Sequence, residues 1–294
     1  MNPFQDKTVL VTGATGSFGK AFIKHTLSQK ILPEKIICFS RDELKQFQLR
    51  ERFPEHPEGI MRYFIGDIRD RERLMQAFKE VDIVIHAAAL KHVSTGQYNP
   101  QEMVKTNILG TQNVIDASIE NNVNKIILLS SDKAVEAKNL YGGSKFIAEG
   151  LFLTANSYVG AGDSKFSVVR YGNVFGSRGS VIDLWNKQAP EGEIFVTVPY
   201  ATRFIITLEQ AVEFIIESIE KMKGLEVFIP KDLPAVDMME VADIYNEIYN
   251  CDIKLIPIRQ GEKIDEKLED GYTSDKARRL TRAEIKKLIQ SSSK

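Results

Sequence analysis

Short apolar runs alternate with longer stretches of helical periodicity through the first half of the chain. Runs rich in valine and isoleucine are typical of strands that are buried on both faces, and each is followed by a helix-like stretch or a turn. The predicted strands cover residues 8–12, 35–39, 61–65, 82–86, 125–130 and 166–170. This alternation predicts an α/β fold, with a Rossmann-like, doubly wound parallel sheet covered by helices on both faces.

A glycine-rich loop follows the first predicted strand directly. Gly13, Gly16 and Gly19 form a G-x-x-G-x-x-G sequence between that strand and a helix-like stretch. Glycines in this context let backbone amides approach a pyrophosphate and aim the positive end of the helix at it. The sequence therefore predicts a dinucleotide site at this loop.

The end of the second predicted strand bears on the type of dinucleotide. A carboxylate there would bind a ribose 2′-hydroxyl, whereas the hydroxyl of Ser40 and the guanidinium of Arg41 suit a 2′-phosphate. We therefore expect NADP, although Asp42 leaves NAD open. Asp67, after the third strand, has two open interpretations: an acceptor for the adenine amino group, or a helix N-cap.

The second half of the chain is organised differently. Between residues 174 and 203 the alternation fails, and several glycines and prolines indicate loops. Helical periodicity returns over residues 207–223, and four basic residues within 276–282 are expected on the solvated face of a terminal helix. We predict an NADP-binding domain of residues 1–173, to which 205–230 return, and a smaller, discontinuous C-terminal substrate-binding portion of residues 174–204 and 231–294.

Composition argues against several classes of protein. The 294 residues suffice for about two domains of roughly 150 residues each. Lys and Arg (39) nearly balance Asp and Glu (40), so no strong field attracts nucleic acid or an anionic membrane. Cys38 and Cys251 do not resemble a disulfide framework or a metal-ligand set, which indicates a reducing cytoplasm. We expect no signal peptide and no membrane-spanning helix, since no apolar run approaches ~20 residues.

Four proton-handling side chains follow the fifth predicted strand. Asp132 and Lys133 come at its carboxyl end, next to Ser131, and Tyr141 and Lys145 stand four residues apart on a predicted helix. Ligands bind at this edge of open α/β sheets, so the group predicts a catalytic site. Other interpretations are a surface helical pair for the tyrosine and lysine, a turn cap for the aspartate, and a solvated loop lysine.

These motifs resemble the extended short-chain dehydrogenase/reductase superfamily. The resemblance rests on the glycine loop, Asp67, Ala87-Ala88-Ala89 and Tyr141-x-x-x-Lys145. The segments 39–43, 86–93, 98–100, 131–134 and 170–174 are similar to soluble UDP-N-acetylglucosamine 4,6-dehydratases of nonulosonic-acid and capsule sugar synthesis, most of all to the 5-inverting type of the pseudaminic acid pathway.

The resemblance implies a lyase whose NADP is reduced and reoxidised within one turnover. Tyr141, as a phenolate favoured by Lys145, would take the proton of the sugar's 4-hydroxyl. Lys133 would act as the base at carbon 5 if burial and nearby cations depress its pKa, and a protonated Asp132 would donate to the departing 6-hydroxyl. The product would be a UDP-4-keto-6-deoxy-N-acetylhexosamine, with inversion at carbon 5 left open.

The resemblance also implies binding residues. The cofactor would be held by Gly13, Thr15, Gly16, Ser17, Phe18, Gly19, Ser40, Arg41, Asp67, Ile68, Ala87, Ala88, Ala89, Lys91, Tyr141 and Lys145. UDP-N-acetylglucosamine or a related nucleotide sugar would be held by Lys91, Ser131, Asn173, Arg203, Arg259 and Glu262. We expect no metal, with His86 and His92 structural, and a homo-oligomer in which an amphipathic helix over 99–121 serves an interface or the core.

Alternatives to the complete reaction stay open at this point. Residues 94–97, 184–195 and 198–201 depart from the family pattern around the sugar, which admits an enzyme arrested at a 5,6-unsaturated 4-keto sugar. Another NADP-dependent nucleotide-sugar epimerase or reductase is a second possibility. A remote third is a non-catalytic NADP-binding regulatory protein, which would have no use for the acid, amine and phenol after the fifth strand.

Overall fold

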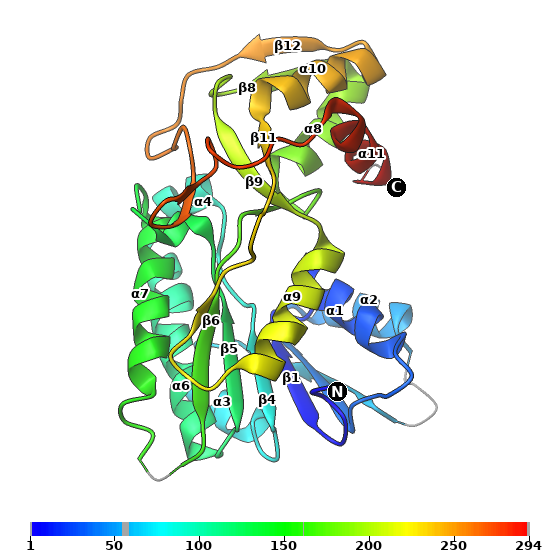
Figure 1. Ribbon diagram of the computed structural model, residues 1–294. Coiled ribbons are helices and arrows are strands. Elements are labelled where there is room, and N and C mark those ends of the chain that lie inside the picture. The colour runs from blue at the N-terminus through cyan, green and yellow to red at the C-terminus, as the bar shows by residue number, and fades with distance from the viewer. Residues whose placement is uncertain (1, 55–58, 161, 293–294) are drawn as a thin grey trace.

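The seven-stranded sheet at the centre of the fold is parallel throughout. The computed structural model describes residues 2–54, 59–160 and 162–292, and within them the strand order is β10-β6-β5-β4-β1-β2-β3 (Figure 1). The strands are β1 (Thr8–Thr12), β2 (Lys35–Ser40), β3 (Met61–Ile65), β4 (Ile83–His86), β5 (Lys125–Leu129), β6 (Lys165–Val169) and β10 (Val227–Phe228). The prediction of a doubly wound α/β fold is therefore confirmed, because each neighbouring pair runs parallel.

Helices cover both faces of this sheet (Figure 1). One face carries α1 (Ser17–Leu27), α2 (Glu43–Arg52) and α9 (Leu208–Lys221), whose apolar side chains share a core with β1 and β2. The other carries α3 (Arg71–Ala77), α6 (Gly110–Glu120) and α7 (Leu140–Ala155), which share a second core with alternate residues of the same strands. Strands buried on both faces explain why their sequences are continuous apolar runs.

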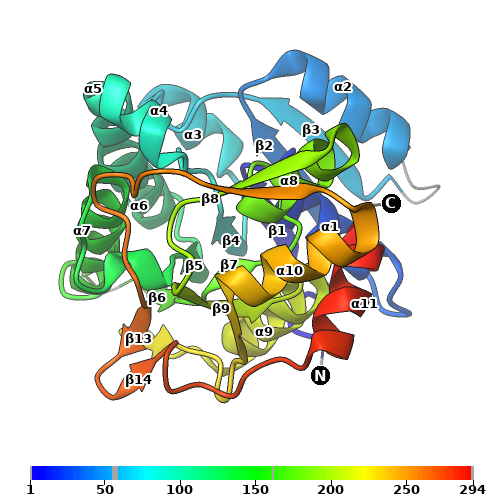
Figure 2. The ribbon, with the colours of Figure 1, turned by 90° about the horizontal axis from the view of Figure 1, so that it is seen from above.

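A third apolar core lies beyond the carboxyl ends of the strands. It is formed by α8 (Val181–Gln188), β8 (Glu193–Val196), α10 (Met238–Tyr249), β12 (Asp252–Leu255) and α11 (Arg282–Ser292). Figure 2 shows these elements gathered together, with β12 alongside β8. Trp185 and Tyr245 meet edge to face in its centre, with ring centroids 5.6 Å apart. This separate core supports the proposed division into two portions.

Short strands connect the two regions. β7 (Asn173–Val174) runs parallel to β9 (Thr202–Ile206), which in turn pairs with β11 (Ala235–Asp237). After β9, the chain forms α9 and β10 against the large sheet, and then leaves it again through β11. A small hairpin, β13 (Lys267–Glu269) with β14 (Tyr272–Thr273), follows later in the chain.

Two features of the second half add to or correct the expectations. The loops indicated by the glycines and prolines of 174–203 lie between α8, β8 and the start of β9, which had not been predicted. Its turn residues stand at the ends of these elements: Pro190 lies in a single turn after α8, and Gly192 closes that turn in the left-handed conformation. The basic cluster also largely precedes the last helix, which begins at Arg282, and Arg279 donates to the carbonyl of Ser274 instead of facing solvent alone.

The helix expected over 99–121 is interrupted. It consists of α5 (Pro100–Val104), a π-helical turn η1 (Lys105–Leu109) and α6. The π turn brings Asn107 against the backbone of Leu90, to which its amide both donates and accepts at 2.8 Å. Single π turns are frequent at functional sites, and this one fixes the strand-end segment that carries Lys91. None of the helices within the described residues is long and apolar enough to span a membrane.

Candidate active site

A cavity of about 1200 Å³ lies at the carboxyl edge of the large sheet, between it and the third core. The glycine loop, the ends of β2, β4 and β5, the start of α7 and the segments 171–174, 177–181 and 259–263 line it. Of the predicted site residues, all but Gly19 and Asp132 reach the cavity wall. Those two lie behind the wall, where Gly19 lets α1 pack against the glycine loop and Asp132 contacts Ser131 and Lys133.

The glycine loop has the shape that a dinucleotide needs. Gly13 has φ +69°, and a Cβ there would lie 2.9 Å from Ala88 Cα. A Cβ at Gly19 would lie 2.3 Å from Ala14 O, so only glycine lets α1 pack against the loop. Gly16 is the N-cap of α1, and among the described residues no side chain caps that end. The first amides of α1 are therefore free to bind a phosphate group.

The side chains at the end of β2 that could contact the ribose differ in the partners they already have. The buried hydroxyl of Ser40 accepts from Thr15 N at 3.2 Å, which ties β2 to the glycine loop. Arg41 is half exposed, with NH1 3.9 Å from Asp67 Oδ2. Asp42 instead caps α2: its carboxylate accepts from Lys45 N at 2.9 Å and from Lys45 Nζ at 2.6 Å. The carboxylate that would suit NAD is thus already engaged.

Asp67 is not a helix N-cap. Asp70 caps α3 by accepting from Arg73 N, whereas Asp67 accepts from the backbone and guanidinium of Arg69, the latter at 2.7 Å. Burial alone would raise the pKa of Asp67, but the hydrogen bonds and charge of Arg69 lower it. Its carboxylate lines the cavity, so of the two interpretations only the adenine contact stays open.

Asp132 is completely buried beneath the cavity floor. It begins a short 3-10 turn after β5, and Ser131 caps this turn by accepting from Lys133 N. Asp132 Oδ1 accepts from Ser131 Oγ at 2.8 Å and from Lys133 Nζ at 2.9 Å, while Oδ2 has no hydrogen-bond partner among the described residues. Burial raises the pKa of Asp132 even though Lys133 opposes this. The interpretation as a turn cap was therefore wrong.

Lys133 is held by three oxygen atoms. Nζ donates to Asp132 Oδ1 and, at 2.7 Å, to Asn173 Oδ1, and lies 3.5 Å from Glu266 Oε1. Burial would lower the pKa of Lys133, but the two carboxylates raise it above the ordinary value. The condition stated for Lys133 as a base, a depressed pKa, is therefore not met in this arrangement, because Asp132 and Glu266 both oppose the effect of burial. The alternative of a solvated loop lysine was wrong.

Tyr141 and Lys145 both lie on the first turns of α7, which Asn139 caps. Lys145 Nζ donates to Leu129 O at 2.6 Å, and burial lowers the pKa of Lys145 to about 8. Burial raises the pKa of Tyr141, and the cation that opposes this is Lys133, not Lys145 as expected. Because Lys145 is only 4% exposed, the two residues are no surface pair.

The predicted substrate residues differ in what they contact. Arg203 donates three hydrogen bonds to the carbonyls of Thr202, Lys263 and Ile264, so much of its guanidinium fixes the segment that follows residue 261. Glu262 accepts from Thr197 Oγ1 and from Arg259 N. All of them reach the cavity, but their part in binding a sugar nucleotide stays a prediction.

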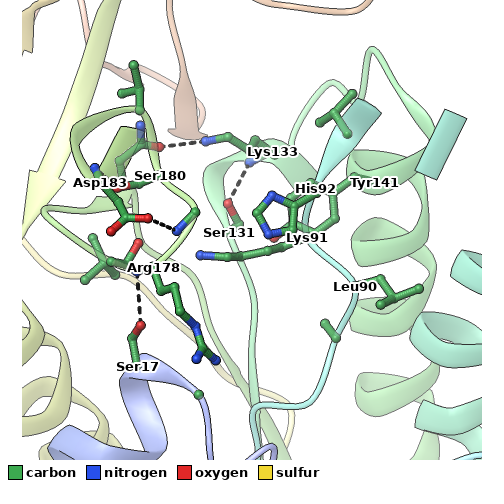
Figure 3. A pocket seen from close by; sticks show the side chains of 18 of the residues that line it. Ser17, Leu90, Lys91, His92, Ser131, Lys133, Tyr141, Arg178, Ser180 and Asp183 are labelled. Carbon is green, nitrogen blue, oxygen red and sulfur yellow. Dashed lines mark hydrogen bonds between the residues drawn. The ribbon is translucent and has the colours of Figure 1, made fainter. Parts of the chain in front are cut away.

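Two further residues of this region, Glu266 and Arg178, were not predicted from the sequence. Glu266 is 3% exposed and reaches the cavity wall from the loop before β13. Arg178 lies across the cavity from Ser131 and Lys133, and its backbone N–H donates to Ser17 Oγ at the start of α1 (Figure 3). Next to it, Gly179 makes room for His92, since a Cβ would lie 2.2 Å from the imidazole. No local sequence signal distinguishes Glu266 or Arg178.

The imidazole of His86 is part of the scaffold. It is buried, and hydrogen bonds join Nδ1 to Thr12 Oγ1 at 2.8 Å and Nε2 to Thr111 Oγ1 at 3.0 Å. Burial lowers the pKa of His86 to about 3, so the ring is neutral. This arrangement joins β1, β4 and α6 below the glycine loop.

Known proteins are similar to this chain in sequence and in fold. The family described as "Polysaccharide biosynthesis protein" matches residues 9–287, and a Campylobacter jejuni protein named UDP-N-acetylglucosamine 4,6-dehydratase (inverting) is 49% identical over 90% of this chain and 77% of its own. The chain belongs to the polysaccharide biosynthesis protein family. A second relative, a Rickettsia rickettsii protein named UDP-glucose 4-epimerase, is 39% identical over 93% of this chain and 81% of its own.

A solved structure extends the likeness to the whole chain. Pen from Bacillus thuringiensis superimposes with a TM-score of 0.92 over 98% of both chains, at 37% identity. The resemblance inferred from the sequence motifs is therefore confirmed at the level of the family and of the fold.

Proposed function

We propose that the protein is an NADP-dependent hydro-lyase that converts UDP-N-acetylglucosamine to a UDP-4-keto-6-deoxy-N-acetylhexosamine. One observation carries this proposal: a buried carboxyl and an amine, Asp132 and Lys133, meet beside Tyr141 at the edge of the sheet. An acid and a base are what the elimination of water requires in addition to the oxidation of carbon 4. Relatives named for this reaction share 49% of the sequence.

The residues of the glycine loop fit a dinucleotide. Uncapped amides at the start of α1 would hold its pyrophosphate, and Gly13 and Gly19 allow the close approach. We assign the adenosine 2′-phosphate to Ser40 and Arg41, because the neighbouring carboxylate, Asp42, is engaged in capping α2. When bound, NADP supplies the hydride acceptor for carbon 4 of the sugar and later the hydride donor for carbon 6.

Tyr141 serves as the base for the 4-hydroxyl. Its phenolate takes the hydroxyl proton and becomes the phenol. Burial raises the pKa of Tyr141, and the ammonium of Lys133 opposes this and favours the phenolate that the step needs. Oxidation at carbon 4 creates a ketone, which makes the hydrogen at carbon 5 acidic. The base for that hydrogen must be an uncharged amine, whereas the carboxylates of Asp132 and Glu266 raise the pKa of Lys133 and favour its ammonium form.

Proton transfer within the Asp132–Lys133 pair resolves this difficulty. Their contact of 2.9 Å allows Lys133 to pass a proton to Asp132, whose burial already favours the acid form. The neutral amine then takes the hydrogen from carbon 5. The proton of Asp132 reaches the 6-hydroxyl through Ser131, whose hydroxyl lines the cavity 2.8 Å from Asp132 Oδ1 and passes one proton on as it receives another, while the carbon–oxygen bond breaks and water leaves. Lys133 returns a proton to carbon 5 when hydride reaches carbon 6. The proton gained by Tyr141 balances the one that Asp132 gives to water.

Several finer points belong to this proposal without a direct test. Lys91, Ser131 and Asn173 would contact the sugar, and Arg203, Arg259 and Glu262 the nucleotide, since all line the same cavity. Inversion at carbon 5, a cytoplasmic location and assembly as a homo-oligomer stay predictions.

An epimerase is the second candidate, because relatives named UDP-glucose 4-epimerase share 39% of the sequence. An epimerase oxidises and re-reduces carbon 4 and needs no acid for a leaving hydroxyl. The buried Asp132 with its raised pKa therefore favours the dehydratase. An enzyme arrested at the unsaturated sugar would keep its cofactor reduced and stop after one turnover.

The direct test incubates the purified protein and NADP with UDP-N-acetylglucosamine in deuterated water. We expect loss of one water by mass spectrometry and a new methyl signal by proton NMR, with deuterium at carbon 5. An exocyclic alkene without a methyl signal would indicate the arrested enzyme, and UDP-N-acetylgalactosamine would indicate the epimerase. Asp132→Asn is the matched control, since it keeps the shape of the side chain and removes the acid.

A further inference from the structure

Glu266 is a buried carboxylate that the proposed reaction does not yet use. It precedes β13 and is 3% exposed. Oε1 lies 3.5 Å from Lys133 Nζ and Oε2 lies 3.2 Å from Lys263 Nζ, so each oxygen faces a cation. A buried carboxylate beside the amine of an acid–base pair can control where the pair's proton resides.

The backbone holds Glu266 rigidly in this place. Its N–H donates to Ser274 Oγ at 2.8 Å, and the N–H of Ser274 donates back to the carbonyl of Glu266 at the same distance. Lys263 Nζ donates to Val135 O at 2.6 Å, just beyond the catalytic turn. Arg203 fixes the same segment from β9 through the carbonyls of residues 263 and 264. The C-terminal segment is thus docked onto the turn that carries Asp132 and Lys133.

We propose that Glu266 is a positioning residue for the Asp132–Lys133 pair, whose fixed negative charge holds the amine in place and leaves Asp132 as the carboxyl that takes the proton. This inference rests on the proposed function, because it assigns Glu266 a part in the same elimination. Glu266 itself neither receives nor donates a proton to the sugar. It acts through Lys133, which it contacts.

The charged groups around Glu266 keep it ionised, and its charge in turn favours a protonated Asp132. Burial alone would raise the pKa of Glu266, but Lys133, Arg203 and Lys263 lower it, so this carboxylate stays ionised. Burial raises the pKa of Asp132, and the negative charge of Glu266 raises it further. The negative charge of Glu266 also raises the pKa of Tyr141. Two carboxyl groups whose environments separate their pKa values in this way are suited to different roles.

Replacing Glu266 tests the assignment through the pH profile. The pair is active when it carries one proton, so kcat/KM rises as the first of its two protons leaves and falls as the second leaves. Glu266→Gln removes a charge that raises both pKa values. We expect both limbs of the profile to move to lower pH by on the order of one unit. A loss of activity without a shift in the profile would assign Glu266 a structural role only and overturn the proposal.

Asp265→Asn is the matched control for the neighbouring position. Asp265 is the preceding residue, and its carboxylate accepts from Thr202 Oγ1 at 2.6 Å instead of contacting Lys133. We expect this variant to keep the wild-type limbs. An equal shift in both variants would mean that any carboxylate in the segment has the effect, and would also overturn the proposal.

A second measurement does not depend on the identity of the substrate. The Lys133 signal is assigned in protein with carbon-13-labelled lysine by its absence from Lys133→Met, and is then titrated by NMR in the protein alone. We expect Lys133 to lose its proton at a lower pH in Glu266→Gln than in the wild type, and equal titrations would overturn the inference. If this shift is present but the wild type turns over no nucleotide sugar, the proposed function fails while the control of Lys133 by Glu266 stands.

Discussion

Replacing Lys145 by methionine removes an ammonium group buried at the edge of the sheet. Lys145 is 4% exposed, and Nζ donates to Leu129 O at 2.6 Å. Burial lowers the pKa of Lys145 from 10.5 to about 8, although Glu149 acts in the opposite direction. We expect Lys145→Met to stabilise the folded protein at neutral pH, because it removes the cost of this buried charge.

The magnitude follows from the difference between the folded and unfolded pKa values. The folded value of about 8 lies below the ordinary 10.5, so between these pH values the unfolded chain binds more protons and stability rises with pH. Below pH 8 the wild type bears the whole cost of the buried charge, about 3 kcal/mol at roughly 1.4 kcal/mol per pKa unit. Methionine leaves the carbonyl of Leu129 without this donor, which offsets about 1 kcal/mol. The expected gain at neutral pH is therefore about 2 kcal/mol.

Urea unfolding of both proteins, followed by circular dichroism from neutral pH to pH 10.5, measures this difference. The advantage of Lys145→Met should be constant below pH 8 and shrink across the window from pH 8 to 10.5. Lys79→Met, at an exposed lysine, is the control and should follow the wild type throughout. Parallel curves for wild type and Lys145→Met would refute the reasoning, because they would show that folding does not perturb the titration of Lys145.

Three further substitutions test the cofactor and the acid. Gly19→Ala places a Cβ 2.3 Å from Ala14 O, so we expect it to lower the free energy of unfolding by ~1–3 kcal/mol and to weaken NADP binding measured by calorimetry. Gly150→Ala, where there is open space, is the control and should stabilise α7 by up to ~1 kcal/mol. Equal effects of the two substitutions would contradict the packing argument. Arg41→Ser should reduce the preference for NADP over NAD about tenfold or more, and an unchanged ratio of dissociation constants would place the 2′-phosphate elsewhere. Asp132→Asn should slow water loss about 100-fold or more while oxidation at carbon 4 continues, and normal dehydration would remove this residue from the mechanism.

The sheet could be predicted because its strands are buried on both faces. Continuous apolar runs such as 125–129 mark such strands in sequence, and the glycine loop, Asp132 and Tyr141 follow from their positions after the strands. The parallel order brings these strand ends together, so residues far apart in the chain share one cavity. Local patterns were sufficient for this part of the site.

The rest of the site depends on contacts between distant segments. Lys263 and Val135 are 128 positions apart, and their hydrogen bond brings Glu266 to Lys133 without any pattern in the loop that carries it. The share of Glu266 in raising the pKa of Lys133, which adds to that of Asp132, could not be predicted for this reason. In segment 174–203 the turn residues were predicted but α8 was not, because it has only eight residues; Gly192 stands at an element end, where its φ of +103° favours glycine.

In the proposed reaction, hydride removed from carbon 4 returns to carbon 6 of the same sugar after water has left. Turnover of UDP-N-acetylglucosamine that carries deuterium at carbon 4 tests this most directly, with the product examined by NMR and mass spectrometry. We expect a dehydrated product that carries the deuterium in its new methyl group. Deuterium retained at carbon 4 of a sugar that has lost no water would contradict the proposed reaction and would establish an epimerase instead.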